Sequence, residues 1–270
     1  MIINFLIDSR YGGPQMIKNH LEKVLKSKFP SIYFDRKNKN YNFSNLKKKN
    51  KLFYFFDVLI NFYKLYLKRK KFRKNEIFFV FSILNIVPII LGIFLKKKII
   101  WYILEKPDTG SYFVFKILYA LGKIEVICIS DSLGKILKLK NYYVYFPSID
   151  INFWKNQYKS KKVNSELKLI CVGNINKTKN HLNLIILLEK LKINYQLNII
   201  GKKLNTQKKY FTQLNDLIKK INKLKKNKIK IYQNKQKKFI KKYLGKSDFF
   251  VLPSKSEGLS IALVEAMSMN

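Results

Sequence analysis

The sequence predicts an α/β protein with two domains, each built from a mostly parallel sheet that helices cover. Short apolar runs of strand length alternate with amphipathic stretches of helix length, which is the pattern of such a sheet. A polar, aperiodic stretch at 154–166 interrupts this alternation, which then starts again. The length of 270 residues is enough for two modest domains. The predicted organisation is a first domain over 1–153, a linker over 154–166 and a second domain over 167–270.

The first domain opens with a strand at 2–7, then Gly12-Gly13-Pro14 and a helix over 14–29. In that helix the apolar residues recur at helical spacing. Further strands are predicted near 31–34, 77–82, 99–103 and 125–129, and helices over 52–67, 88–95, 112–121 and 132–138.

An uncharged stretch of 19 residues, Ile77–Leu95, is long enough to be considered as a membrane span. Polar residues, Pro88 and a glycine interrupt it, and its first part favours a strand. The preferred interpretation is a buried strand at 77–82, a polar corner and a helix over 88–95 with Pro88 at its first position. A single spanning helix is the alternative.

The second domain repeats the alternation. Strands are predicted at 167–172, 197–200, 228–232 and 248–252, and helices over 181–191, 206–224, 237–244 and 260–269. Doubly wound nucleotide-binding halves have more strands than these four, and the last helix has no following strand to return to. The second domain is therefore expected to be truncated and poorly folded.

The net charge of +39 comes from 55 basic residues, of which only Arg10, Arg36, Arg69 and Arg73 are arginines. Nucleic-acid interfaces depend on the bidentate arginine fork, which is nearly missing here. Lysine, asparagine, isoleucine, phenylalanine and tyrosine all have AT-rich codons, so biased codon usage explains the composition better than a nucleic-acid partner. The 47% of hydrophobic residues excludes a disordered polycation.

Two cysteines, Cys128 and Cys171, each lie in an apolar run and predict neither a zinc site nor a disulfide framework. A reducing compartment, the cytoplasm, is expected. The start of the sequence has no basic region before its short apolar run, so no secretory signal is expected.

The segment 248–267 contains the candidate residues for binding and catalysis. It reads as a buried strand, a tight polar loop and a helix whose amino end carries Gly258, Leu259, Ser260 and Ile261. Free backbone N–H groups and the helix dipole at such an end form an anion site. Glu257 precedes this end and Glu265 follows about two turns later. Two carboxylates so placed could accept hydrogen bonds from sugar hydroxyls; the alternative is a capping glutamate and an exposed one.

The spacing Glu257-x7-Glu265 within 254–267 resembles the donor-site signature of the retaining glycosyltransferases of family 4 (group 1), which have the GT-B fold of two Rossmann-like domains. Three further segments resemble the family in its own order. They are the glycine loop at Gly12 and Gly13, the segment 147–153 before the linker, and the first donor-domain loop at 172–180.

The resemblance implies a retaining transfer of a sugar from a nucleotide-diphosphate donor to a hydroxyl acceptor, without a metal or other cofactor. Glu257 would contact the donor sugar, Glu265 the ribose, and Lys179 the diphosphate leaving group. Backbone N–H groups at Gly12, Gly13 and 258–261 would face the donor phosphates, with Gly173 and Asn174 in the donor loop. Glu105 would lie on the acceptor side. The implied acceptor is a glycan or lipid-linked glycan of cell-surface polysaccharide synthesis.

The sequence departs from the family at two of these positions. The family has an arginine where this chain has Asn174, and often a histidine where Leu104 precedes Glu105. An inactive remnant of such an enzyme is therefore an alternative function, and a basic nucleic-acid-binding protein is another.

A stretch rich in aromatic residues, 52–67, lies between two lysine-rich runs within 47–74. This pattern is typical of a helix lying in an anionic membrane surface, on the inner face of the membrane. The alternative, slightly preferred, is a core helix with solvated lysines at its ends. The helix over 206–224 and the run 235–242 are expected to be solvated faces.

Overall fold

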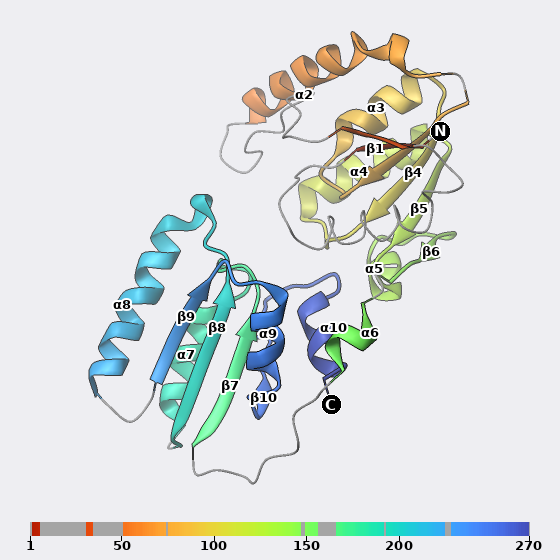
Figure 1. Cartoon of the computed structure of the whole chain (residues 1–270). Coiled ribbons are helices and arrows are strands. Elements are labelled where there is room, and N and C mark those ends of the chain that lie inside the picture. The colour runs from red at the N-terminus through yellow and green to blue at the C-terminus, as the bar shows by residue number, and fades with distance from the viewer. Residues whose placement is uncertain are drawn as a thin grey trace. The chain divides into compact units, whose positions relative to one another are not determined.

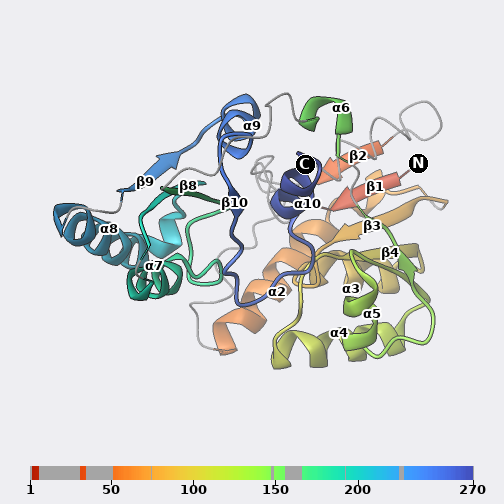
Figure 2. The same cartoon turned by 90° about the horizontal axis from the view of Figure 1, so that it is seen from below.

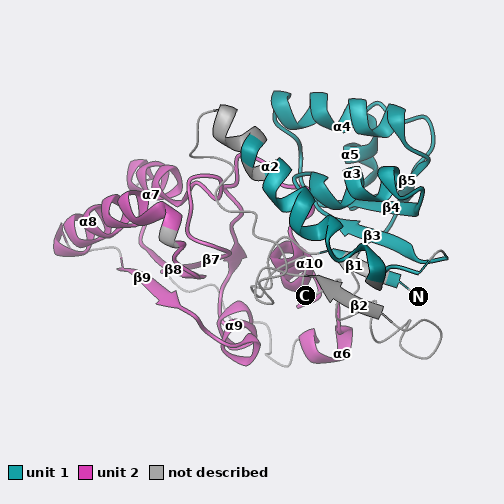
Figure 3. Ribbon diagram, turned by 90° about the horizontal axis from the view of Figure 1, so that it is seen from above, with its two compact units in different colours: residues 1–148 teal, residues 149–270 magenta. Residues whose placement is uncertain are grey.

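The computed structural model describes residues 2–5, 31–34, 51–73, 75–146, 149–155, 166–191, 193–224 and 228–269. Gly12, Gly13 and the helix predicted over 14–29 lie outside them. The chain divides into two compact units, Met1–Ser148 and Ile149–Asn270 (Figure 3). This division falls before the boundary predicted after residue 153, because Trp154 packs into the core of unit 2.

In its described residues, unit 1 contains a parallel sheet with the strand order β2-β1-β3-β4-β5-β6. The strands are β1 (Ile2–Phe5), β2 (Ser31–Phe34), β3 (Ile77–Phe81), β4 (Lys98–Ile103), β5 (Ile124–Cys128) and β6 (Tyr143–Val144). The helices are α2 (Lys51–Tyr66), η1 (Arg69–Lys71), α3 (Ile86–Phe94), α4 (Thr109–Leu121) and α5 (Asp131–Ile136). The core contains large aromatic side chains, including the fully buried Trp101.

The uncharged stretch 77–95 folds as strand β3, a corner and helix α3, as predicted. Helix α3 begins two residues earlier than expected, and Pro88 still lies in the first turn, where no backbone donor is needed. Helix α4 also begins early, because the Asp108 carboxylate accepts the Ser111 N–H at 2.8 Å and caps it. Within the described ranges, we find no helix with both the length and the apolar character that crossing a bilayer demands.

Unit 2 contains a four-stranded parallel sheet with the order β10-β7-β8-β9 in the part of it that the structure describes (Figure 1). The strands are β7 (Leu167–Val172), β8 (Tyr195–Gly201), β9 (Lys228–Gln233) and β10 (Phe249–Phe250). The helices are α6 (Ile151–Trp154), α7 (His181–Lys190), η2 (Asn205–Gln207), α8 (Lys208–Leu224), α9 (Lys237–Leu244) and α10 (Ile261–Met267). The predicted strands are confirmed, although β10 is shorter than expected.

Helices cover both faces of the unit 2 sheet (Figure 2). One core lies under α7 and α8 and contains Tyr195, Leu197 and Leu214. The other lies under α9 and α10 and contains Trp154 and Leu244. The chain runs from β7 through β8 to β9 and then returns to place β10 on the other side of β7. The strand order therefore reverses between β7 and β10, and in open α/β sheets ligands bind at the carboxyl ends of the strands at such a point.

Candidate active site

An ion pair lies at the reversal point of unit 2. The Lys179 Nζ donates to Glu257 Oε1 at 2.6 Å, and the two side chains are 18% and 26% exposed. Lys179 comes from the loop after β7 and Glu257 from the loop after β10. A backbone hydrogen bond from Lys255 N–H to the Thr178 carbonyl, 2.8 Å long, joins the two loops. The structure therefore brings together the lysine and the carboxylate that the sequence singles out.

Two glycines allow the strand ends beneath this pair to come close. Gly173 has φ +154°, and a Cβ there would lie 3.0 Å from Lys179 Cε. A Cβ on Gly201, at the end of β8, would lie 1.8 Å from the Gly173 carbonyl oxygen. Gly201 was not a candidate from the sequence, since an isolated glycine at a strand end is a common feature. Asn174, the next residue after Gly173, is exposed in the same loop.

The amino end of α7 is capped from α8. The Tyr210 hydroxyl accepts the Leu182 N–H at 3.2 Å, and Asn180 precedes the helix in a left-handed conformation with φ 58°. Burial raises the pKa of Tyr210, and the contacts of its hydroxyl with the backbone of Leu182 and His181 oppose this shift in part. The amino end of α7 thus has a hydrogen-bond acceptor from within the protein, the Tyr210 hydroxyl. The Lys179 side chain, just before this helix, contacts Glu257 instead.

His181 is fully buried at the start of α7, and neither ring nitrogen has a hydrogen-bond partner among the described residues. Burial, with a smaller contribution from Lys179, lowers its pKa to about 4. The ring is therefore neutral at pH 7, and its two polar atoms carry an uncompensated desolvation cost.

We expect His181→Met to stabilise the protein by about 1–2 kcal/mol at pH 5, because it removes this cost. The folded pKa lies below the unfolded value of ~6.5, so wild-type stability falls as the pH drops from about 6.5 towards 4. The variant should lose this dependence. Urea unfolding at about pH 5 and about pH 8 measures both effects. An unchanged pH slope in the variant would contradict the assignment to His181.

Glu265 lies in the middle of α10 and is buried, with its side chain 9% exposed. Burial raises its pKa, and Lys237 opposes this shift. The Lys237 Nζ lies 3.5 Å from Glu265 Oε1 and 5.8 Å from the centre of the Trp154 ring. The predicted ribose-binding carboxylate is therefore held by a lysine from α9. The sequence analysis missed Lys237, since nothing in a lysine-rich helix distinguishes the one that faces a carboxylate.

The loop that carries Gly258, Leu259, Ser260 and Ile261 lies between β10 and α10. Ser260 is the N-cap residue of α10, but its side chain makes no capping hydrogen bond. Its buried hydroxyl has no partner among the described residues. Anion binding by these backbone N–H groups stays a prediction, as does the role of Gly12 and Gly13, which lie outside the described residues.

In unit 1, Glu105 follows β4 and meets the corner after β3. The Ser82 hydroxyl donates to Glu105 Oε1, and burial raises the pKa of this carboxyl although hydrogen bonds from Ser82 and the Ile83 N–H lower it in part. Ser82 itself has φ 76°. Glu105 thus stabilises the corner at Ser82, whose backbone conformation is unfavourable for a residue other than glycine. The acceptor-side role of Glu105 stays a prediction.

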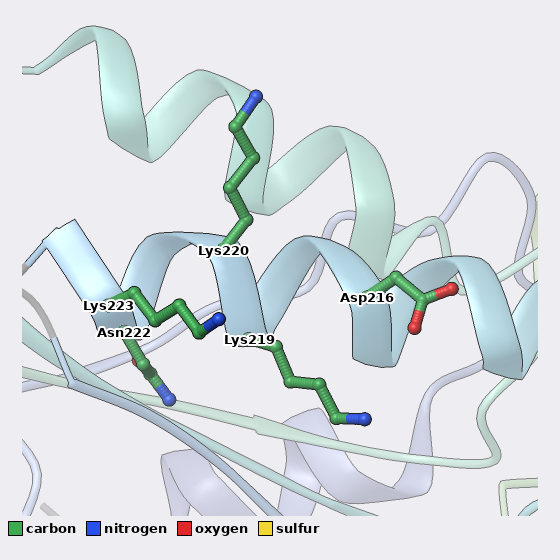
Figure 4. A pocket seen from close by; sticks show the side chains of 5 residues that line it. All are labelled: Asp216, Lys219, Lys220, Asn222 and Lys223. Carbon is green, nitrogen blue, oxygen red and sulfur yellow. The ribbon is translucent and has the colours of Figure 1, made fainter.

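Helix α8 carries a basic depression of about 600 Å³, and Figure 4 shows the side chains that line it. They are Asp216, Lys219, Lys220, Asn222 and Lys223. All five are exposed and come from one helix, and Lys220 points away from the others (Figure 4). The Asn222 side chain is bonded to Ile229 of β9 at both its amide atoms. This is the solvated face that the sequence predicts.

The fold is shared with solved structures. The Anabaena protein HepE, in complex with UDP and glucose, matches at TM-score 0.70 and 14% identity, over 99% of this chain and 78% of its own. Sucrose-phosphate synthase from Thermosynechococcus elongatus matches at TM-score 0.73 and 12% identity, over 99% and 79%. The UDP-forming α,α-trehalose-phosphate synthase from Burkholderia vietnamiensis matches at TM-score 0.71 and 10% identity, over 100% and 80%.

These matches agree with two Rossmann-like parallel-sheet domains, as the sequence predicts. The comparison with curated proteins gave no match. Residues 152–270, which include the whole Lys179–Glu257 site and Glu265, match the model of the family described as glycosyl transferases group 1.

Proposed function

We propose that the protein is a glycosyltransferase that moves a sugar from a nucleoside-diphosphate donor to a hydroxyl group of an acceptor. The observation that supports this most strongly is the Lys179–Glu257 pair at the reversal point of the unit 2 sheet. The group 1 family model covers the same residues, and the Anabaena neighbour was solved with UDP and glucose.

The central electrostatic task of the reaction is to stabilise the departing diphosphate. The Lys179 ammonium is paired with the Glu257 carboxylate. When a donor enters, the diphosphate oxygens compete for the ammonium, and the Glu257 carboxylate is released to accept hydrogen bonds from sugar hydroxyls. The bond between the anomeric carbon and the phosphate oxygen breaks, and the acceptor oxygen bonds to that carbon. The acceptor proton goes to the leaving phosphate oxygen, so transfer with retention needs no separate base. Lys179 is proposed to stabilise the leaving diphosphate in place of a metal ion.

Glu265 is proposed to accept hydrogen bonds from the ribose of the donor. An ionised carboxylate offers both oxygens as acceptors, whereas protonation turns one of them into a donor. Burial raises the pKa of Glu265, and Lys237 opposes this shift and so favours the ionised form. Lys237 is thus a positioning residue that acts through Glu265.

We expect Lys237→Met to weaken UDP binding by about tenfold, or ~1.4 kcal/mol. The loss should grow as the pH falls, because without Lys237 the Glu265 carboxyl becomes protonated at a higher pH. Calorimetric titration with UDP over a pH series measures both. Lys241→Met, one turn further along α9, is the matched control, since Lys241 faces Phe153 and not Glu265. A variant with the wild-type pH profile would contradict this role.

The proposed acceptor is a glycan or lipid-linked glycan of cell-surface polysaccharide synthesis, and the proposed compartment is the cytoplasm. The buried, free thiols of Cys128 and Cys171 are consistent with a reducing compartment.

The proposed function is tested by nucleotide release from a panel of UDP-, GDP- and ADP-sugars, with and without glycan and lipid-linked acceptors. Binding and acceptor-dependent release of one nucleotide support the transferase. Binding without turnover indicates an inactive remnant of such an enzyme. Binding of DNA alone would overturn the proposal in favour of a nucleic-acid-binding protein.

A further inference from the structure

Helix α2 of unit 1 has a buried face and an apolar exposed face. Leu65 is fully buried, as expected of a core helix. On the opposite side, exposed apolar side chains follow one another at helical spacing in a single stripe. They are Phe56 (53% exposed), Leu59 (46%), Ile60 (51%), Tyr63 (62%) and, in the turn directly after the helix, Leu67 (56%). Sequence analysis allowed either a core helix or a surface helix, and α2 has a face suited to each.

The neighbouring helices extend this apolar surface. Phe94, at the end of α3, is 61% exposed and packs edge-on against Phe62 and Tyr66 of α2 at ring distances of 6.1 and 5.7 Å. On α4, Phe113 (66% exposed), Ile117 (44%) and Leu121 (68%) are spaced four residues apart. Right-handed crossovers from β2 to β3, β3 to β4 and β4 to β5 place α2, α3 and α4 on the same face of the sheet, and α3 contacts both other helices. We call the exposed residues of these helices the α2–α4 face.

Lysines border the α2–α4 face. Lys64 lies on α2 beside the apolar stripe and is exposed. At the end of α4, a cavity of about 760 Å³ is lined by Leu121 together with four lysines, Lys96, Lys97, Lys98 and Lys123. The single acidic residue in its lining, Glu125, is paired with Lys98 at 2.9 Å. The cavity therefore presents an excess of positive charge next to an exposed leucine.

We propose that the α2–α4 face binds the surface of an anionic phospholipid bilayer. The apolar stripe would enter the boundary between headgroups and acyl chains, and the bordering lysines would contact lipid phosphates. Exposed apolar side chains gathered on neighbouring helices mark an interaction site, and the lysines specify a negatively charged partner. A second copy of this chain is disfavoured because the same positive charges would face one another.

The test is sedimentation of the full chain with vesicles, either of phosphatidylcholine alone or with about 30% phosphatidylglycerol. We expect binding to the anionic vesicles only, and a loss of binding when salt rises from about 0.1 to 0.5 M. Leu59→Ser/Tyr63→Ser should reduce binding about tenfold, through lost apolar insertion. Lys96→Gln/Lys123→Gln should reduce it and flatten the salt dependence.

Matched controls exist on unit 2. Ile186→Ser/Leu187→Ser removes two exposed apolar side chains of α7, and Lys219→Gln/Lys223→Gln removes two exposed lysines of α8. Both should bind like the wild type. Equal binding to neutral vesicles, equal losses in the controls, or self-association that Leu59→Ser/Tyr63→Ser abolishes would each overturn the proposal. The vesicles contain neither donor nor acceptor, so a failure here would leave the proposed glycosyl transfer untouched.

Discussion

Lys179→Met is expected to lower the rate of sugar transfer by about 10²–10³-fold, the range found when one preorganised charge-stabilising group is removed. The Lys179 Nζ is the cation that meets Glu257 at 2.6 Å, and the donor diphosphate is proposed to take over this contact. The variant leaves Glu257 without its partner, so Glu257 would then repel the diphosphate. Binding of UDP should weaken strongly, whereas binding of uridine, which has no phosphates, should change little.

The measurement is steady-state nucleotide release, together with titration by UDP and by uridine. Lys190→Met is the matched control, because Lys190 is an exposed lysine at the far end of the helix that follows Lys179. Glu257→Gln should lower turnover because it loses the proposed contact with the sugar. It should bind UDP at least as tightly as the wild type, since the diphosphate no longer competes with a carboxylate for Lys179. Equal turnover in Lys179→Met and Lys190→Met would reject the proposed role of the lysine.

Gly201→Ala is expected to destabilise unit 2 by about 3 kcal/mol, because the added Cβ would lie 1.8 Å from the Gly173 carbonyl oxygen. The colliding atom belongs to the backbone, so a side-chain rotation cannot relieve the overlap. The ends of β7 and β8 must separate, and the loop that carries Lys179 begins there. Stability and UDP affinity should therefore fall together.

Thermal unfolding and limited proteolysis measure the effect. Gly110→Ala is the control, since the nearest atom to its added Cβ is 3.8 Å away and the site lies in the first turn of α4. That variant should be neutral or slightly more stable, as alanine favours a helix more than glycine does. Similar melting temperatures for the two variants would show that the β7–β8 contact tolerates a side chain.

Most of the fold could be predicted from the sequence, because its strands are short apolar runs and the segments between them have apolar residues at helical spacing. Elements without such a signal were missed, namely β6 and α6. The start of α4 was missed because Asp108-Thr109-Gly110 resembles a loop, and the capping bond to Ser111 decides otherwise. Strand pairing over two residues, as in β10, depends on the neighbouring strand and leaves little trace in the sequence.

Some residues of the candidate site could be identified from the sequence, and others could not. Lys179 and Glu257 were singled out through a family resemblance, and the structure brings these residues, 78 positions apart, into contact. Lys237 could not be identified, because its significance depends on which lysine of α9 faces the buried Glu265. The burial of His181 could not be inferred either, since a single histidine after a polar loop carries no periodic signal of burial.

The two tryptophans of the chain lie one in each unit, Trp101 in the core of unit 1 and Trp154 in that of unit 2. Each unit therefore carries one tryptophan, and in Trp101→Phe the tryptophan emission belongs to unit 2 alone. Since the Lys237 ammonium stands over the Trp154 ring, any ligand that draws Lys237 or Glu265 out of place alters the charge beside that indole. Donor entry could thus be followed optically in an unlabelled protein, without knowledge of which sugar is transferred.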